Sequence, residues 1–458
     1  MIATILTVIL AVVNSIALLA MCLRSRKSRG PRTYGFFHPY CNAGGGGERV
    51  LWTAVRCLQR RYPNIKCVIY TGDLEASSDE ILATAERRFH IKLSQPVSFV
   101  YLRSRPCLEA KYYKVFTLAL QSAFSMLVGL EAIIKHTPHV FVDTMGYAFT
   151  LPIFKILGGC TTVSYVHYPT ISTDMLCSVH SRRTGVNNSS MVASSSFLTQ
   201  AKILYYKCFA VLYGFIGNVC GDVTMVNSSW TYGHIREIWG VECHLVFPPC
   251  SVEDFQQLES EANPEREFRI VSLAQFRPEK DHMLQLKSLK ILQKHLSEAQ
   301  FGKVKLVLCG SCRDHEDEQR IEDLKIQANC LEITKNVEFK VDIPYSALKK
   351  ELQKASAAIH TMWNEHFGIA VVECIAAGLI TVAHNSGGPR MDIIREGCGF
   401  RASTAEEYAQ IFAKIIMMSE RDRTTISEAG KRSMSRFNER SFEEKFLEIV
   451  QSWVEENR

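Results

Sequence analysis

Short apolar runs alternate with amphipathic stretches along most of this chain, a pattern that predicts an α/β fold with parallel sheets. In the first half we expect strands at 33–38, 67–71, 97–102, 139–143, 161–166 and 222–226. In the second half we expect strands at 268–274, 304–309, 336–341 and 357–360. Helical spacing follows most of these runs, so repeated strand-helix units are predicted in both halves.

The length of the chain indicates more than one domain. With 458 residues it is too long for one compact core. A polar, acidic stretch follows a proline-rich segment and predicts a linker at 251–267. The linker would separate an N-terminal domain at 33–250 from a C-terminal domain at 268–436. An amphipathic helix is expected in the last segment, 437–458.

The chain begins with an apolar segment, 2–23, that is long enough to span the hydrocarbon core of a bilayer. Positive residues follow this segment and none precedes it. They are Arg24, Arg26, Lys27, Arg29 and Arg32. A cleaved signal peptide would carry its charges before the apolar run, so 1–32 is interpreted as a transmembrane signal anchor with a basic flank. The positive-inside rule then places the following domains in the cytosol.

Two further apolar stretches, 112–134 and 203–219, lie in the N-terminal half. Lys114 and Glu131 interrupt the first, and the second contains tyrosines suited to the headgroup region. Each stretch could span the membrane, lie at its surface, or form a buried helix of the domain. The N-terminal domain is therefore expected to face the membrane.

Composition narrows the class of protein further. The net charge is +6, and five positive charges lie in the basic flank alone, so no nucleic-acid-binding surface is indicated. The 16 cysteines are scattered and lack the paired spacing of zinc sites. Reduced thiols in a cytosolic protein are the better interpretation.

The strongest chemical signal lies at 362–392. A predicted strand ends just before Glu365, and the helix that follows carries a second carboxylate, Glu373. Free backbone N–H groups near Phe367 and Gly368, at the positive end of the helix dipole, would lie close to both carboxylates. Such groups suit a diphosphate and the hydroxyls of sugars. Two glutamates alone are weak evidence, because Glu is common in the first turn of any helix.

Other candidate residues follow the predicted strands. Gly46, Gly47 and Arg49 belong to a glycine-rich turn after the first strand, which could bind phosphate or simply be flexible. Asp143 and His167 end two later strands, where open α/β sheets bind ligands. A lone histidine in such a place can equally make a structural hydrogen bond.

The turn after the first strand of the C-terminal domain carries Arg277 and Lys280. Two cations there could neutralise a diphosphate. An exposed turn with Arg and Lys is ordinarily only solvated, so this assignment depends on the motif downstream.

These motifs together resemble family 4 of the retaining glycosyltransferases. The similarity includes the seven residues between Glu365 and Glu373, the Gly-Gly-x-Glu-Arg-Val turn at 45–50 and the position of Lys280. It implies the GT-B fold, an α/β architecture in which two Rossmann-like domains face each other across a cleft, here with an N-terminal transmembrane helix. It also implies front-face retaining transfer. No Asp-x-Asp pair occurs, so no metal and no other cofactor is expected.

The resemblance implies roles for individual residues. His167, Glu365 and Lys280 would be catalytic, facing the reacting sugar, holding its hydroxyls and binding the diphosphate. The donor-binding residues would be Gly47, Arg277, Lys280, Glu365, Phe367, Gly368, Ile369 and Glu373, the last on the ribose. Gly46, Arg49 and Asp143 would lie on the acceptor side. Family 4 usually has Arg where this chain has Gln275, and Arg277 is displaced by two residues, so its role is open.

Four longer segments are similar to the GDP-mannose-dependent α-1,2-mannosyltransferases of the dolichol-linked oligosaccharide pathway. They are 38–52, 164–170, 274–282 and 363–369. This resemblance implies GDP-mannose as donor and a dolichol-pyrophosphate oligosaccharide as acceptor, receiving its fourth and fifth mannoses for protein N-glycosylation. It implies a single-pass protein of the endoplasmic reticulum membrane with cytosolic catalytic domains, and allows association with other mannosyltransferases of the pathway.

Two alternatives remain open from the residues alone. A family 4 enzyme could use another nucleotide sugar or a lipid such as phosphatidylinositol as acceptor. A membrane-anchored, non-catalytic subunit could keep the fold and only bind a partner. Such a subunit should have lost its charged site residues, whereas this chain retains Glu365, Glu373, Lys280 and Arg49.

Overall fold

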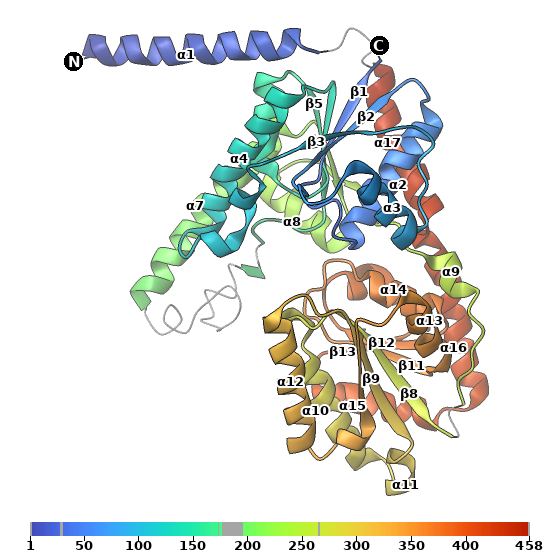
Figure 1. Cartoon of the computed structure of the whole chain (residues 1–458). Helices are drawn as coiled ribbons and strands as arrows, with labels where there is room; N and C mark the ends of the chain where they lie inside the picture. The colour runs from blue at the N-terminus through green and yellow to red at the C-terminus, as the bar shows by residue number, and fades with distance from the viewer. Residues whose placement is uncertain (1, 28–30, 173, 176–195, 264–265, 457–458) are drawn as a thin grey trace. The chain divides into compact units, whose positions relative to one another are not determined.

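The computed structural model describes residues 2–27, 31–172, 174–175, 196–263 and 266–456 (Figure 1). The chain divides into two compact units. The first comprises Met1–Phe247 with Glu443–Arg458, and the second comprises Pro248–Phe442. Arg29 of the basic flank lies outside the described residues.

The first unit is built on a parallel sheet in the order β3-β2-β1-β4-β5-β6-β7. Its strands are β1 (Thr33–Phe37), β2 (Lys66–Thr71), β3 (Ser98–Tyr101), β4 (Val140–Asp143), β5 (Thr161–Val166), β6 (Val223–Val226) and β7 (His244–Leu245). The first six follow the Rossmann order, in which strands are added toward one edge of the sheet up to β3 and toward the other edge from β4, so the order reverses between β1 and β4. A ligand site is expected where these two strands end.

Helices cover both faces of this sheet. They are α2 (Gly46–Arg61), α3 (Ser78–Phe89), α4 (Thr117–Lys135), α7 (Ser196–Cys220), α8 (Ser229–Trp239) and α17 (Glu439–Glu456), with the turns η1 (Arg105–Leu108), η2 (Ala110–Tyr112), η3 (Ala148–Thr150) and η4 (Ile153–Leu157). The N-terminal helix α1 (Ile2–Ser25) contacts η4 instead. Figure 1 shows α4 and α7 on one side of the sheet and α2 and α17 on the other. Successive side chains of β4 point to opposite faces of the sheet. Phe141 belongs to the apolar core formed with α4 and α7, whereas Val142 is on the face covered by α2 and α17.

The last helix belongs to the first unit from Glu443 onward. The guanidinium of Arg56 on α2 lies 2.7 Å from the carboxylate of Glu443. Phe446 and Val450 are buried against Leu58 of α2. The C-terminal segment therefore completes the apolar layer that covers this face of the sheet.

The second unit has its own parallel sheet, in the order β10-β9-β8-β11-β12-β13. Its strands are β8 (Phe268–Leu273), β9 (Val304–Gly310), β10 (Val337–Val341), β11 (Ala357–His360), β12 (Ile380–His384) and β13 (Phe400–Ala402). This is again the Rossmann order, with the reversal between β8 and β11.

Helices also cover both faces of the second sheet. They are α9 (Val252–Gln256), α10 (His282–Leu292), α11 (Glu298–Phe301), α12 (His315–Cys330), α13 (Tyr345–Lys354), α14 (Ile369–Ala376), α15 (Ala405–Met417) and α16 (Glu420–Ser433), with the turns η5 (Pro278–Lys280), η6 (Gln293–His295), η7 (Thr334–Asn336), η8 (Pro389–Ile393) and η9 (Met434–Phe437). Leu289 of α10, Leu324 of α12 and Phe412 of α15 pack on one apolar cluster with the strands.

Two segments contain helix where the sequence indicated a linker and a glycine-rich turn. The predicted linker at 251–267 begins with helix α9, and Phe255 is fully buried in the second unit, because the apolar positions of this short stretch have a core to pack on. Helix α2 begins at Gly46, inside the glycine run, because the side chain of Glu48 accepts a hydrogen bond from the backbone N–H of Gly45 and so closes the first turn.

The C-terminal end of α1 is fixed to the first unit. Leu23 is buried, and three residues of the basic flank donate hydrogen bonds to backbone carbonyls. The bonds are Arg24 to Ile156 (2.6 Å), Arg26 to Ile134 (3.1 Å) and Lys27 to Gly159 (2.6 Å). These carbonyls lie at the C-terminal ends of α4 and η4, where cations are favourable.

Two helices of the described residues are long and apolar enough to cross a membrane by length and composition, Thr117–Lys135 and Leu198–Cys220. About a third of each is buried. The buried side chains, such as Val128 of α4 and Phe209 of α7, belong to the core of the first unit. The outer sides are also apolar, so each helix is part of the domain and presents a second apolar face.

Candidate active site

Each sheet carries a polar cluster at its reversal point, where ligands bind in open α/β folds. In the first unit, His38 follows β1 and Thr144 follows β4. In the second unit, Lys280 follows β8 and His360 ends β11. The two clusters are described in turn.

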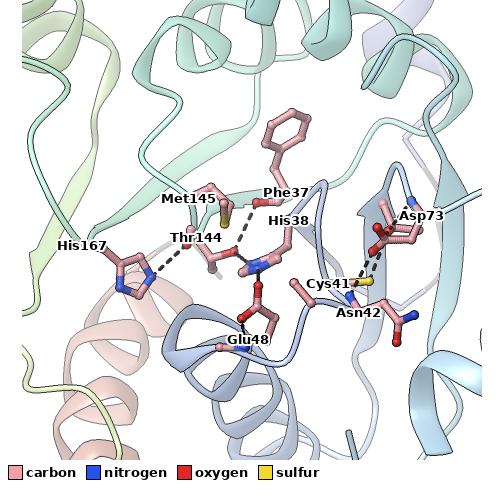
Figure 2. Close-up of polar contacts among 12 residues, drawn as sticks. Phe37, His38, Cys41, Asn42, Glu48, Asp73, Thr144, Met145 and His167 are labelled. Atoms are coloured by element: carbon pink, nitrogen blue, oxygen red, sulfur yellow. Dashed lines mark hydrogen bonds and ion pairs between the residues drawn. The ribbon is translucent and has the colours of Figure 1, made fainter. Parts of the chain in front are cut away.

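Thr144 holds two imidazole rings in the first unit (Figure 2). Its hydroxyl donates to the carbonyl of Phe37 at 3.2 Å, so it accepts a hydrogen bond from Nδ1 of His38 at 2.8 Å. Its own carbonyl accepts a hydrogen bond from Nε2 of His167 at 3.1 Å. The proton on each of these ring nitrogens is therefore fixed by the partner it meets.

Glu48 lies beneath the glycine turn and connects it to His38. Its carboxylate accepts from the backbone N–H of Gly45 at 2.6 Å and lies 3.4 Å from Nε2 of His38. Burial would raise the pKa of Glu48, but the hydrogen bond and charge of His38 and the backbone N–H groups outweigh it, so the pKa is lowered. An ionised Glu48 thus anchors the start of α2 to the end of β1.

Gly47 lies beside both imidazoles. A Cβ built on Gly47 would be 3.7 Å from Nε2 of His167 and 3.7 Å from Cε1 of His38, which is ordinary contact. Gly46 is the exposed first residue of α2. The side chain of Arg49 points toward α3, where its guanidinium lies 5.2 Å from the ring centroid of Phe89. The structure thus brings Gly47 and His167 together and places Arg49 against α3.

A second set of contacts holds the turn before the glycines. Asp73 accepts the backbone N–H of Asn42 at 2.9 Å and the guanidinium of Arg105 at 2.7 Å. The thiol of Cys41 donates to the hydroxyl of Thr71 at 3.2 Å. Figure 2 shows this group on the opposite side of the turn from His38. These contacts anchor the glycine turn at both ends.

Asp143 is buried, with 1% of its surface exposed. One carboxylate oxygen accepts the backbone N–H groups of Met145 and Gly146, at 3.0 and 3.2 Å. Burial raises the pKa of Asp143 to about 7, although these hydrogen bonds oppose the shift. Asp143 therefore stabilises the turn after β4 through these hydrogen bonds. Any effect of Asp143 on the acceptor would be indirect, through the shape of that turn.

In the second unit, Lys280, Glu365 and His360 form one polar cluster. The sequence predicted the first two as site residues but not His360. Nζ of Lys280 lies 2.5 Å from Oε2 of Glu365, and Nε2 of His360 lies 3.1 Å from the same oxygen. Burial would raise the pKa of Glu365, but the Lys280 ammonium and the His360 hydrogen bond hold it well below its usual range. The structure thus joins two of the predicted catalytic residues directly.

The turn that carries Lys280 is tied to the end of β11. The hydroxyl of Thr361 donates to the carbonyl of Lys280 at 2.7 Å and accepts from the amide of Gln285 at 2.9 Å. Both Thr361 and Gln285 are buried. These contacts explain why an ammonium and a carboxylate far apart in sequence meet with good geometry.

Helix α14 begins directly after this cluster. Gly368 has φ +107°, a conformation that side chains rarely adopt, and Ile369 is the first residue of the helix. The ring of Phe367 is buried against Phe437, with centroids 5.2 Å apart, so only its backbone can serve a ligand. Glu373 lies one turn further along the helix and is half-buried.

Arg277 has a different partner from the one its predicted role requires. Its Nε lies 3.3 Å from the carboxylate of Glu279, and 39% of its side chain is exposed. Its backbone carbonyl accepts the N–H of Lys280 at 3.2 Å, whereas its side chain pairs with Glu279 rather than with Glu365. Its role as a phosphate ligand stays a prediction.

The sequence analysis missed His38, Thr144 and His360 as site residues. All three are polar residues at the carboxyl ends of β1, β4 and β11. The rule that selected His167, a polar residue where a parallel strand ends, would have found them as well. Within the described residues, no three His, Cys, Asp or Glu side chains are grouped as a metal site would require.

Two Rossmann-ordered parallel sheets give this chain the GT-B fold, and its match to glycosyl transferases group 1 over residues 253–433 makes it a glycosyltransferase. The solved structure of WaaG, a glycosyltransferase involved in lipopolysaccharide biosynthesis, shares the fold. It superposes with a TM-score of 0.59 at 13% identity and covers 91% of this chain and 99% of its own.

Sequence comparisons define the family. Residues 31–239 match the model of the ALG11 mannosyltransferase N-terminus, and residues 253–433 match glycosyl transferases group 1. The human GDP-Man:Man(3)GlcNAc(2)-PP-Dol alpha-1,2-mannosyltransferase is 48% identical, over 93% of this chain and 88% of its own. The Dictyostelium discoideum protein of the same name is 44% identical, over 94% and 87%. This chain belongs to the ALG11 mannosyltransferase family.

Proposed function

We propose that this protein transfers mannose from GDP-mannose, in α-1,2 linkage and with retention of configuration, to a dolichol-pyrophosphate-linked oligosaccharide. The main support is the 48% identity with the human enzyme, which extends over 93% of the chain. The fourth and fifth mannoses are the additions we expect, as the sequence resemblance implied.

The donor half of the reaction is assigned to the second unit. The leaving diphosphate carries negative charge as the glycosidic bond breaks, so it needs fixed positive groups. Lys280 and the N–H groups at the start of α14 are suited to that task. Glu365 would orient the sugar hydroxyls and Glu373 the ribose. No metal or other cofactor is required in this scheme.

The mechanism we propose is a front-face transfer. The acceptor hydroxyl approaches the anomeric carbon from the side that the diphosphate leaves, and a phosphate oxygen takes its proton. Within the first unit, His167 and the turn at Gly47 are assigned to the reacting sugar. The protein's main contribution is then to position two substrates and to stabilise the departing anion.

A membrane-bound acceptor fits the apolar outer faces of the first unit. Exposed residues on α4 and α7 include Leu127 (52%), Ile134 (46%), Val211 (74%) and Phe215 (63%). These helices adjoin each other, since the hydroxyl of Tyr205 accepts the backbone N–H of Ala119 at 3.0 Å. We propose that these faces rest on the cytosolic leaflet of the endoplasmic reticulum, with α1 as a single membrane span.

The test is transfer by purified full-length protein in vesicles that contain dolichol-pyrophosphate oligosaccharides with three or four mannoses. Radiolabelled GDP-mannose should extend both acceptors, and an α-1,2-mannosidase should release the label. Addition of a chelator should leave the rate unchanged. Parallel reactions with other nucleotide sugars, and with phosphatidylinositol as acceptor, test the alternatives. Transfer only in those reactions would contradict the proposed donor or acceptor.

A further inference from the structure

Glu365 is held by two donors that converge on one of its oxygens. Nζ of Lys280 and Nε2 of His360 lie 2.5 and 3.1 Å from Oε2. An ionised carboxylate only accepts hydrogen bonds, so Nε2 of His360 must carry the proton. Neither contact uses the second oxygen, Oε1. The carboxylate is thus fixed in orientation while one of its oxygens is not engaged by these two residues.

His360 is itself held rigidly. It is the last residue of β11, and its backbone carbonyl accepts a hydrogen bond from the hydroxyl of Tyr408 at 2.8 Å. Only 6% of its side chain is exposed. Nδ1 is buried and has no hydrogen-bond partner, so Nε2 is the ring nitrogen that makes the side-chain contact. The ring therefore serves Glu365 through Nε2.

Lys280 cannot serve Glu365 and a diphosphate equally well. A bound diphosphate carries more negative charge than one carboxylate, so it will draw the ammonium away from Glu365. Glu365 would then lose its charged partner in a site where only 14% of its side chain is exposed. A buried carboxylate without a partner is costly and tends to turn away or take up a proton.

We propose that His360 is the positioning residue that keeps Glu365 ionised and oriented toward the donor sugar when Lys280 engages the diphosphate. This role rests on the proposed function, which assigns Lys280 to the diphosphate and Glu365 to the sugar. His360 does not touch the substrate in this scheme. Its hydrogen bond to Glu365 persists when Lys280 moves to the diphosphate.

The experiment compares three substitutions of His360 in the full-length protein. His360→Leu removes the hydrogen bond. His360→Gln can place an amide N–H near the position of Nε2, whereas the shorter side chain of His360→Asn cannot reach Glu365. For each variant, kcat for mannose transfer and the Kd for GDP, which lacks the sugar, are measured. The control is His282→Leu, since His282 is also buried, with 3% exposed, and stacks on Phe276.

We expect His360→Leu and His360→Asn to lower kcat about 10- to 100-fold, the scale of one hydrogen bond to a charged group, while the Kd for GDP changes less than about twofold. His360→Gln should recover most of the lost turnover, and His282→Leu should keep kcat near that of the wild type. If His360→Leu does not fold, the test is the comparison of kcat between His360→Gln and His360→Asn.

Three outcomes would overturn this role for His360. They are wild-type turnover in the Leu and Asn variants, parallel loss of GDP binding and turnover, and a Gln variant no better than Asn. Failure of the proposed function is distinguishable, because the wild-type protein itself would then transfer no mannose from GDP-mannose. In that case the same variants are compared with whichever nucleotide sugar the wild type does use.

Discussion

The carbonyl oxygen of Thr144 accepts a hydrogen bond from Nε2 of His167 at 3.1 Å, and the hydroxyl of the same residue holds His38. One residue at the end of β4 therefore fixes both imidazoles. Gly47 faces the two rings, with ordinary contact distance available for a Cβ atom. Packing within the protein does not require a glycine at position 47. A substrate group that approaches this position would explain why the residue is glycine.

Gly47→Ala should therefore separate folding from activity. The added methyl group has room, and alanine favours the first turn of α2, so thermal stability should be unchanged or slightly raised. Transfer should fall at least about tenfold, because the methyl group would occupy the space beside His167. The measurements are thermal unfolding and mannose transfer.

The matched control is Gly35→Ala, where a Cβ would lie 2.7 Å from the ring of Tyr70. That substitution should lower stability, whatever it does to activity. Normal transfer by Gly47→Ala would show that no substrate group approaches this position.

The effects of substituting Lys280 and Glu365 on transfer should not be independent. Lys280→Ala should lower transfer by about two to three orders of magnitude, the scale of removing one charge-stabilising donor, and Glu365→Gln should mainly lower turnover. Each substitution also breaks the 2.5 Å ion pair, so the double variant should be much less impaired than the product of the two effects. A double-mutant cycle on kcat/KM measures this coupling, and simple additivity would contradict it.

Arg277 should contribute little to the reaction. Its guanidinium pairs with Glu279 at the surface, and exposed pairs of this kind are worth about 0–1 kcal/mol. Arg277→Ala should therefore change kcat/KM by less than about fivefold. A loss as large as that of Lys280→Ala would instead show that Arg277 moves to the diphosphate when the donor binds.

The sequence could predict the positions of most strands along the chain and the residues near their ends, because both follow from hydrophobic periodicity and glycine-rich turns. It could not predict which polar groups meet. Lys280 and Glu365 are 85 residues apart, and only the register of β8 against β11 brings them together. Hydropathy also could not show whether α4 and α7 are core helices or membrane helices, because a protein core and a bilayer both favour apolar side chains. In the structure each helix has one face toward the core and one outward.

Asp143 predicts a pH dependence of stability. Its pKa is about 7 in the folded protein and about 3.9 when unfolded, so the folded state binds more protons between these values. The stability that Asp143 contributes is complete below about pH 4 and is lost as the pH rises through about 7, at about 1.4 kcal/mol per pH unit. Asp143→Asn does not titrate, so its stability relative to the wild type should rise from about pH 5 to about pH 7 and then level off.

Chemical unfolding of both proteins across this pH range provides the measurement. Asp79→Asn, on the exposed first turn of α3, serves as the control for a surface carboxylate. Parallel stability curves for the wild type and Asp143→Asn would show that Asp143 is ionised in the folded protein throughout.

The N-terminal helix should have two separable parts. From sequence alone, removal of 1–32 should cost the folded domains nothing, because no strand is lost. The structure changes that expectation, since Arg24, Arg26 and Lys27 donate to carbonyls at the ends of α4 and η4. Deletion of 2–22 keeps these hydrogen bonds and removes the packing of Leu19 on the core, so it should lower stability less than deletion of 2–32, which also costs about 1 kcal/mol for each hydrogen bond lost.

Both truncated proteins should remain partly bound to membranes, because the outer faces of α4 and α7 are apolar and do not depend on α1. The measurements are thermal unfolding, fractionation in low and high salt, and transfer to a lipid-linked and a water-soluble acceptor. Apolar contact should resist salt, whereas binding through the basic flank alone would not. If deletion of 2–22 yields a fully soluble enzyme that still prefers the lipid-linked acceptor in a bilayer, the outer faces of α4 and α7 are not the membrane contact, and the acceptor must be reached in another way.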